Sequence, residues 1–260
     1  MKRFFAFALV AVIACNNEKK TSISMPGAYN MLSQSVKSAK RDTTYTTLRQ
    51  LKIFTDDYMM YANVNPSDSA SSFGIGTYST DKDTVIENVI FGASDSSKND
   101  KLRNFKLVIE KTDTGYKQII PEIESRGQKF KLTEEYNSVG ATAKTPLDGA
   151  WKLVKYYIIN GKDTTNMEMI QFKTYYAGHF IFGHSYTDSA HKTHTGIGFG
   201  TFEMNGSNKV KESPVASTYS AVSGQNFDID IELNGNDGFK QTIINKDGSK
   251  LVEVYERLKK

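Results

Sequence analysis

Histidine is the residue type in this sequence best suited to hold a metal, and all four histidines lie between residues 179 and 194. His191 and His194 could each offer a ring nitrogen, with His184 reaching them from across a hairpin. Asp188 is the only nearby acid at ligand spacing, and no cysteine lies close to it. We therefore expect exposed loop histidines, and we predict neither a metal site nor another cofactor.

His179 is a different kind of candidate, because on a strand it shares one face with Ile181. Next to Glu212, it would form a polar spot in a mainly apolar cup, as in many small-molecule sites. Tyr58 and Glu87 hold the matching positions in an earlier, related segment. Two interpretations stay open: the pairs contact a ligand, or each pair satisfies its own hydrogen bonds inside the core.

Glycines recur in the segment "GIGFG", residues 196–200, as they do in loops that cradle a phosphate. Such a loop needs a helix N-terminus after it, whereas the following "TFEMNGSNK" is typical of a strand and a hairpin. Gly198 and Gly200 would instead alternate on one strand face and leave space for an aromatic ring or a ligand. We include both among the residues expected to line the cup.

No arrangement of nucleophile and base is evident. Ser223 lacks the nucleophile-elbow pattern, and Glu253 and Glu256 lie on opposite faces of one predicted strand, so they cannot face each other across a substrate. The enzymatic alternative that we keep is an isomerase or dehydratase that uses His179 with Glu212. We expect a protein without enzymatic activity.

The chain contains two copies of one domain-sized unit. "GYKQII" begins at Gly115 and "GFKQTII" begins at Gly238, while "QLKIFTDDYMMYAN" matches "QFKTYYAGHFIFGH". "GIGTY" likewise matches "GFGTF", and Glu87 falls on Glu212. The matches keep their order, and their offset stays between 119 and 125 residues. A repeat of this length is a whole domain rather than a solenoid unit.

Within each copy, apolar residues recur with a period of two, as in β-strands. Phe227, Ile229 and Ile231 alternate with acids, and turn sequences such as "NGKD", "NGNDG" and "STDKD" separate the runs. Each copy has room for about eight strands, and a closed sheet of that size can enclose one small ligand. The predicted fold class is all-β, with two tandem antiparallel barrels. A single wide membrane barrel is disfavoured, because the outward faces carry charges.

The first residues predict export. Residues 1–3 form a basic start, and residues 4–14 are an uncharged apolar run that is too short to span a bilayer as a helix. "VIAC" resembles the bacterial lipobox, in which cleavage before the cysteine leaves that residue lipidated, although Val12 replaces the usual leucine. Cys15 is the only cysteine in the sequence. We expect a lipid anchor at Cys15 in the outer membrane, facing the periplasm or the exterior.

These features divide the chain into five parts. They are a signal peptide (1–14), a lipid-anchored tether (15–25), a first barrel (26–139), a linker (140–147) and a second barrel (148–260). Removal of the signal peptide changes the net charge from +4 to 31 − 29 = +2. Because that charge is small and no basic block stands out, we expect no nucleic-acid partner.

The start of the second copy, "GAW", is similar to the G-x-W motif of lipocalin-like (calycin) barrels. In that family the tryptophan closes the base of the barrel and an arginine from the last strand lies over it, so the resemblance implies a cation–π pair of Trp151 and Arg257. In the first copy, Tyr29 and Ser138 stand at these positions, which implies a base closed differently. The repeated pattern also resembles tandem lipocalin-like lipoproteins of Bacteroidetes-type bacteria.

The resemblance implies a cell-envelope lipoprotein whose lipocalin-like barrels bind a small hydrophobic molecule. The fold hosts many unrelated ligands, so it does not name this one. The alternative is a structural or interaction lipoprotein with filled barrels, in which two similar surfaces contact one envelope protein.

Overall fold

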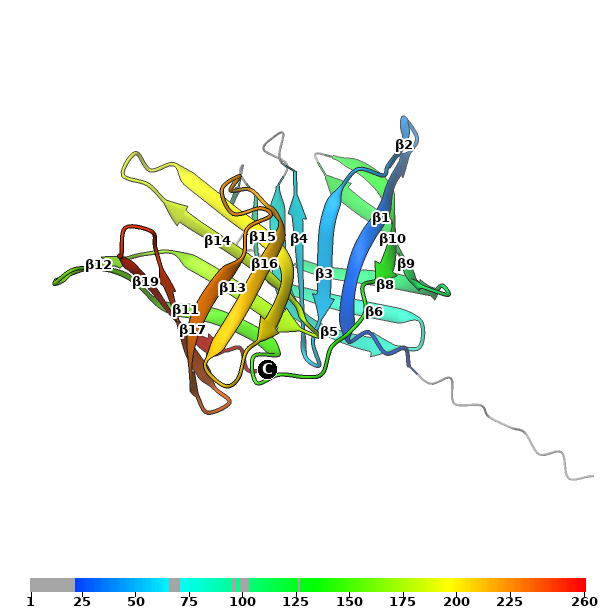
Figure 1. The fold of residues 1–260 in the computed structure, drawn as a ribbon. Coiled ribbons are helices and arrows are strands. Elements are labelled where there is room, and N and C mark those ends of the chain that lie inside the picture. Colours follow the sequence, from blue (N-terminus) through cyan, green and yellow to red (C-terminus); the bar gives the residue numbers. More distant parts are fainter. Residues whose placement is uncertain (1–21, 66–70, 95–96, 99–102, 126) are drawn as a thin grey trace, which may run out of the picture.

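The computed structural model describes residues 22–65, 71–94, 97–98, 103–125 and 127–260, and every regular element within these ranges is a β-strand. The strands form two closed antiparallel barrels that stand side by side (Figure 1). This confirms the prediction of an all-β fold with two tandem barrels. The predicted signal peptide and Cys15 lie outside the described residues. Within the described ranges, no helix is long and apolar enough to cross a membrane.

The first barrel is a ring of eight strands with two short additional strands. The order around the ring is β1-β3-β4-β5-β6-β8-β9-β10, and β10 pairs with β1 to close it. The additional strand β2 lies beside the second half of β1, and β7 pairs with β6. The strands are β1 Gly27–Ser38, β2 Arg41–Tyr45, β3 Arg49–Phe54, β4 Tyr58–Val64, β5 Ser72–Asp81, β6 Thr84–Ser94, β7 Ser97–Lys98, β8 Arg103–Lys111, β9 Gly115–Ser125 and β10 Gln128–Ser138.

The second barrel repeats this plan. Its ring follows the order β11-β13-β14-β15-β16-β17-β18-β19, the pairing of β11 with β19 closes it, and β12 extends β11 as β2 extends β1. The strands are β11 Gly149–Asn160, β12 Asp163–Met167, β13 Ile170–Tyr176, β14 His179–Thr187, β15 Thr193–Met204, β16 Lys209–Ser217, β17 Phe227–Asn234, β18 Gly238–Ile244 and β19 Lys250–Arg257.

The repeated GxG segment marks a β-bulge in each barrel. The strand register shifts at Gly76 between β5 and β6, and at Gly200 between β15 and β16. A Cβ on Gly200 would lie 2.1 Å from the carbonyl oxygen of Ser213, and one on Gly76 would lie equally close to that of Asn88. Glycine at these positions therefore lets the neighbouring strand approach closely.

The two barrels pack on each other through an apolar cluster that both contribute. The cluster joins the outer faces of β3–β6 to those of β13–β15. The rings of Phe91 and Phe172 meet across it with centroids 5.3 Å apart. A Cβ on Gly183 would lie 2.5 Å from the ring of Phe73, so this glycine makes room for that ring. The strands at this interface are consequently buried on both faces.

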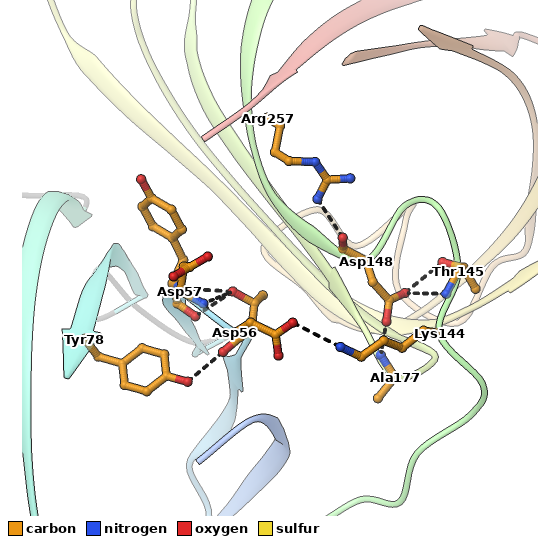
Figure 2. A network of polar contacts seen from close by, with 10 residues as sticks. Asp56, Asp57, Tyr78, Lys144, Thr145, Asp148, Ala177 and Arg257 are labelled. Atoms are coloured by element: carbon orange, nitrogen blue, oxygen red, sulfur yellow. Dashed lines mark hydrogen bonds and ion pairs between the residues drawn. The ribbon is translucent and has the colours of Figure 1, made fainter. Parts of the chain in front are cut away.

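The linker between the barrels is held against both of them, as Figure 2 shows. Lys144 Nζ lies 3.0 Å from Oδ2 of Asp56 in the first barrel. The Asp148 carboxylate accepts hydrogen bonds from the Thr145 hydroxyl (2.7 Å) and from the Ala177 backbone N–H (3.2 Å) in the second barrel. These contacts and the apolar cluster fix the barrels relative to each other.

Candidate functional site

The second barrel contains a cavity of about 470 Å³ that opens at one end of the ring. Its walls are mainly apolar and include Met169, Phe182, Phe227, Ile229, Ile243 and Leu251. Its polar lining residues are the three tyrosines Tyr156, Tyr186 and Tyr219, together with Glu168, Gln171, Lys173, His184, Glu212, Gln241 and Glu253. An apolar cavity with a few grouped polar side chains is the usual construction of a small-molecule site.

Strand alternation directs these polar groups inward. On β13, Gln171 and Lys173 lie two residues apart and therefore share the inner face. On β14, the same rule places Phe182 and His184 inside. Three further strands carry Glu212 (β16), Gln241 (β18) and Glu253 (β19), and Glu168 lies in the connection between β12 and β13.

Lys173 is the buried cation of this site, with 4% of its side chain exposed. Its Nζ lies 2.6 Å from Oε1 of Glu212 and donates a hydrogen bond to Oε1 of Gln241 at 3.2 Å. The ammonium also lies 5.1 Å from the ring centroid of Tyr175 and 5.6 Å from that of Phe180. A buried ammonium without such partners would be costly, and here a carboxylate, an amide oxygen and two aromatic rings surround it.

Glu253 is the acceptor on which the second half of the network converges. It accepts hydrogen bonds from the Nε2 groups of Gln241 (2.5 Å) and Gln171 (3.3 Å), and from the Tyr255 hydroxyl (2.6 Å). The hydroxyl of Tyr175 similarly donates to Glu212. Burial raises the pKa of both tyrosines well above the ordinary value, so both stay protonated donors.

His184 and Tyr219 extend the network to the mouth of the cavity. His184 Nδ1 lies 3.1 Å from Oε1 of Gln171, an amide oxygen that can only accept, so Nδ1 carries the proton. Burial lowers the pKa of His184 to about 4, so the ring is neutral near pH 7 and Nε2 is an acceptor. The Tyr219 hydroxyl, 2.7 Å away, therefore donates to Nε2. The hydrogen bonds thus run in one direction, from Tyr219 through His184 and Gln171 to Glu253.

Six residues of this network recur in the first barrel. Lys52 pairs with Glu87 at 2.6 Å and donates to Gln118 at 2.9 Å, as Lys173 does with its partners. Burial raises the pKa of Glu87 from its ordinary value. The matching pairs are Gln50 and Gln171, Lys52 and Lys173, Glu87 and Glu212, Gln118 and Gln241, Glu134 and Glu253, and Tyr136 and Tyr255.

The two networks differ at the positions of His184 and Tyr175 in the second barrel. Asn63 pairs with Gln50 across β3 and β4, at the register position that His184 occupies opposite Gln171. Phe54 likewise replaces Tyr175 two residues after the lysine. The extension to the mouth is therefore a feature of the second barrel.

The predicted pairs of His179 with Glu212 and of Tyr58 with Glu87 are wrong. His179 shares the outer face of β14 with Ile181, which belongs to the cluster between the barrels, and Tyr58 lies in the same cluster. Glu212 and Glu87 face inward and pair with lysines instead. Because these strands are buried on both faces, their alternation alone could not show which face lines the cup.

The two glycines expected to line the cup have other roles. A Cβ on Gly198 would lie 2.4 Å from the ring of Phe182, so an aromatic ring occupies the space that this glycine leaves. Gly200 serves the close approach of β15 and β16 at the bulge. The expectation of space for a ring thus holds at Gly198, and neither glycine lines the cavity.

The three histidines considered as metal ligands lie apart. His184 belongs to the cavity network, whereas His194 Nε2 lies 2.7 Å from Oδ2 of Asp188 in the hairpin between β14 and β15. His191 lies in the turn of that hairpin with a φ of 60°. Among the described residues, no group of three or more potential metal ligands is present.

At the base of the second barrel, the Arg257 guanidinium lies over the Trp151 ring, 4.0 Å from its centroid, as the resemblance implied. It also donates to the carbonyl oxygens of Asp148 (2.7 Å) and Pro146 (3.1 Å). Gly149 has a φ of 143°, and a Cβ there would collide with Arg257, which explains the glycine of "GAW".

The base of the first barrel is built from tyrosine rings. Tyr29 and Ser138 face each other across β1 and β10, the register position of Trp151 and Arg257. The Tyr29 ring meets that of Tyr116 edge-on, with centroids 4.9 Å apart, and its hydroxyl donates to the Met25 carbonyl. Tyrosine rings thus stand here in place of the stack of Trp151 and Arg257, as the departure from the motif implied.

Neither a scan against protein-family models nor a comparison with curated proteins returns a match to this chain. Two tandem eight-stranded antiparallel barrels are consistent with a lipocalin-like fold.

Several network residues were missed in the sequence, among them Gln171, Lys173, Gln241 and Tyr219. The signal for three of them was the repeat, since Q-x-K recurs in "QLK" and "QFK", and "GYKQII" and "GFKQTII" share a glutamine. Tyr219 lies in the connection between β16 and β17, where no pattern distinguishes it.

The ion pair makes a prediction about stability. Lys173→Met should lower the free energy of unfolding by about 3–5 kcal/mol, because Glu212 stays buried without its cation. Lys173→Met combined with Glu212→Gln should recover part of this loss. Urea unfolding near neutral pH measures both, with the exposed Lys152→Met as the matched control, expected to change stability by about 0.5 kcal/mol or less. A Lys173→Met protein as stable as this control would contradict the assigned role.

His184 predicts a specific dependence of stability on pH. The pKa is 6.5 in an unfolded chain and about 4 in the fold, so the unfolded chain binds the proton first as the pH falls. Stability should therefore decrease between these values by up to about 3 kcal/mol, relative to a protein without this group. The reference protein without this histidine is His184→Asn, which introduces the residue that the first barrel has at the matching position, Asn63. Urea unfolding of both at about pH 7.5 and about pH 4.5 checks the difference. A difference that does not change with pH would count against a buried neutral histidine.

Proposed function

We propose that this protein is a lipid-anchored binding protein of the bacterial cell envelope, whose second barrel holds a small, mainly apolar molecule. The observation that carries the proposal is the cavity of about 470 Å³ with apolar walls and a grouped polar network. Its volume lies within the usual range for small-molecule sites. The cavity favours this function over a structural role with a completely filled second barrel.

The network supports binding because its side chains hydrogen-bond to one another. Lys173, Gln241 and Glu253 hold one another through hydrogen bonds that do not require a ligand. A ligand would therefore meet polar groups already in place and would not have to organise them, which lowers the entropic cost of binding. The apolar walls would contribute binding free energy through the surface that they remove from water.

The anchor supports the envelope location. Cys15 would carry the lipid, and the part of the predicted tether before residue 22 would connect it to the first barrel, because Met25 is buried in that barrel's core and the Ile23 N–H donates to the Lys82 carbonyl oxygen. Such a tether can extend by roughly 3.3–3.6 Å per residue, so both barrels would stay close to the membrane surface. A hydrophobic molecule held in the cavity of the second barrel would be shielded from water.

Filling the cavity tests the binding function. Ile243→Trp places a large ring at the inner face of β18, whereas Ile244→Trp places the same ring at the neighbouring position, where the native side chain is 59% exposed. We expect Ile243→Trp to weaken binding of the uncharged fluorescent probe N-phenyl-1-naphthylamine by more than about tenfold, with Ile244→Trp close to wild type. Fluorescence titration measures this. Absent binding, or equal binding by all three proteins, would favour the envelope interaction alternative.

Metabolic labelling tests the anchor. In a bacterial host, the wild-type chain should incorporate an alkyne-labelled fatty acid and fractionate with membranes, because the lipobox cysteine is acylated. Cys15→Ser should lose the label and leave the membrane fraction. Equal labelling of both chains would place the lipid elsewhere, and an unlabelled wild-type chain would remove the anchor from the proposal.

A further inference from the structure

The polar network of the second barrel uses most of its hydrogen-bond donors internally. Lys173 donates to Gln241 and pairs with Glu212, and the rings of Tyr175 and Phe180 lie beside its ammonium. The side-chain amides of Gln171 and Gln241 donate to Glu253. A ligand group that needs a strong donor therefore competes with partners already in place.

The network leaves acceptors on residues that line the cavity. Tyr219 donates its only hydroxyl proton to His184, and its oxygen keeps lone pairs that can accept. Tyr219 lines the cavity, and 39% of the residue is exposed. Both described contacts to the Glu212 carboxylate fall on Oε1, so Oε2 is a second acceptor.

The formal charges of the lining point the same way. Lys173 is the one cation among the lining residues, against the buried carboxylates of Glu212 and Glu253 and the exposed carboxylate of Glu168, which gives 1 − 3 = −2. A negative field inside a cavity with low-dielectric walls attracts cations and repels anions.

We propose that the ligand of the second barrel is an apolar molecule with a hydrogen-bond-donating head group, an ammonium or a hydroxyl, and not a carboxylate. This inference rests on the proposed binding function and specifies its ligand class. The head group would donate to the Tyr219 oxygen and to the acidic side of the network, while the chain would lie against the apolar walls. A carboxylate in the same place would face acceptors and like charge, which costs binding free energy.

Three ligands of equal chain length test the head group. n-Decylamine, n-decanol and n-decanoate, each below its micelle concentration, displace N-phenyl-1-naphthylamine from the protein of residues 16–260, which carries both barrels. We expect decylamine to displace the probe at a concentration at least about tenfold lower than decanoate, with decanol between them. The net charge without residues 1–14 is 31 − 29 = +2, so unspecific attraction would favour decanoate instead.

Tyr219→Phe assigns the effect to the acceptor. This change keeps the ring and removes the oxygen, so the preference for decylamine over decanoate, with each displacement referred to the probe affinity of the same variant, should fall severalfold. Ile244→Trp, which alters the outer face of β18, should keep the full preference.

The outcomes separate the two proposals. Probe binding that Ile243→Trp blocks, together with displacement by decanoate as effective as by decylamine, would overturn the head-group assignment and leave the binding function standing. A preference for decylamine that Tyr219→Phe leaves unchanged would also overturn the assigned acceptor. Absence of probe binding would remove the binding function and this inference with it.

Discussion

A lysine inside a β-barrel must have a partner, and this constraint organises the second barrel. Lys173 requires Glu212, and its remaining contacts hold Gln241, which in turn holds Glu253. Glu253 then fixes the orientation of Gln171, and Gln171 sets the tautomer of His184. The interior is consequently a connected polar structure beside an apolar cavity. A buried ion pair is seldom the most stabilising choice for a core, since well-packed apolar residues often do as well. That it is kept is consistent with a role in positioning polar groups for a ligand.

The duplication shows which parts of this structure the two domains share. Both barrels have the lysine, both carboxylates, both glutamines and the tyrosine. The network is therefore older than the divergence of the two copies, and both copies retained it. The copies differ at the base, where rings replace the Trp151 and Arg257 stack, and at the extension to the mouth, where Asn63 stands for His184. Their outer faces pack together, so the pair forms one unit.

The fold could be predicted from sequence because period-two alternation, turn residues and the domain-length repeat all indicate short antiparallel strands. The direction of individual side chains could not. His179 and Tyr58 lie on strands whose outer face is buried by the other barrel, so apolar residues on both faces concealed the inner one. Lys173 was missed because a lysine in an alternating strand is usually exposed. Its recurrence with Glu212 and Gln241 in both copies was the available signal for a buried network.

The central claim is that the second barrel binds a small molecule, and native mass spectrometry of the gently purified protein tests it most directly. Residues 16–260, exported to the periplasm of a bacterial host, should carry one equivalent of a small molecule per chain. Extraction with solvent should remove this adduct, and its fragmentation should show an apolar body with an amine or hydroxyl. A mass equal to that of the polypeptide alone, in protein that also fails to bind an added apolar probe, would contradict the claim.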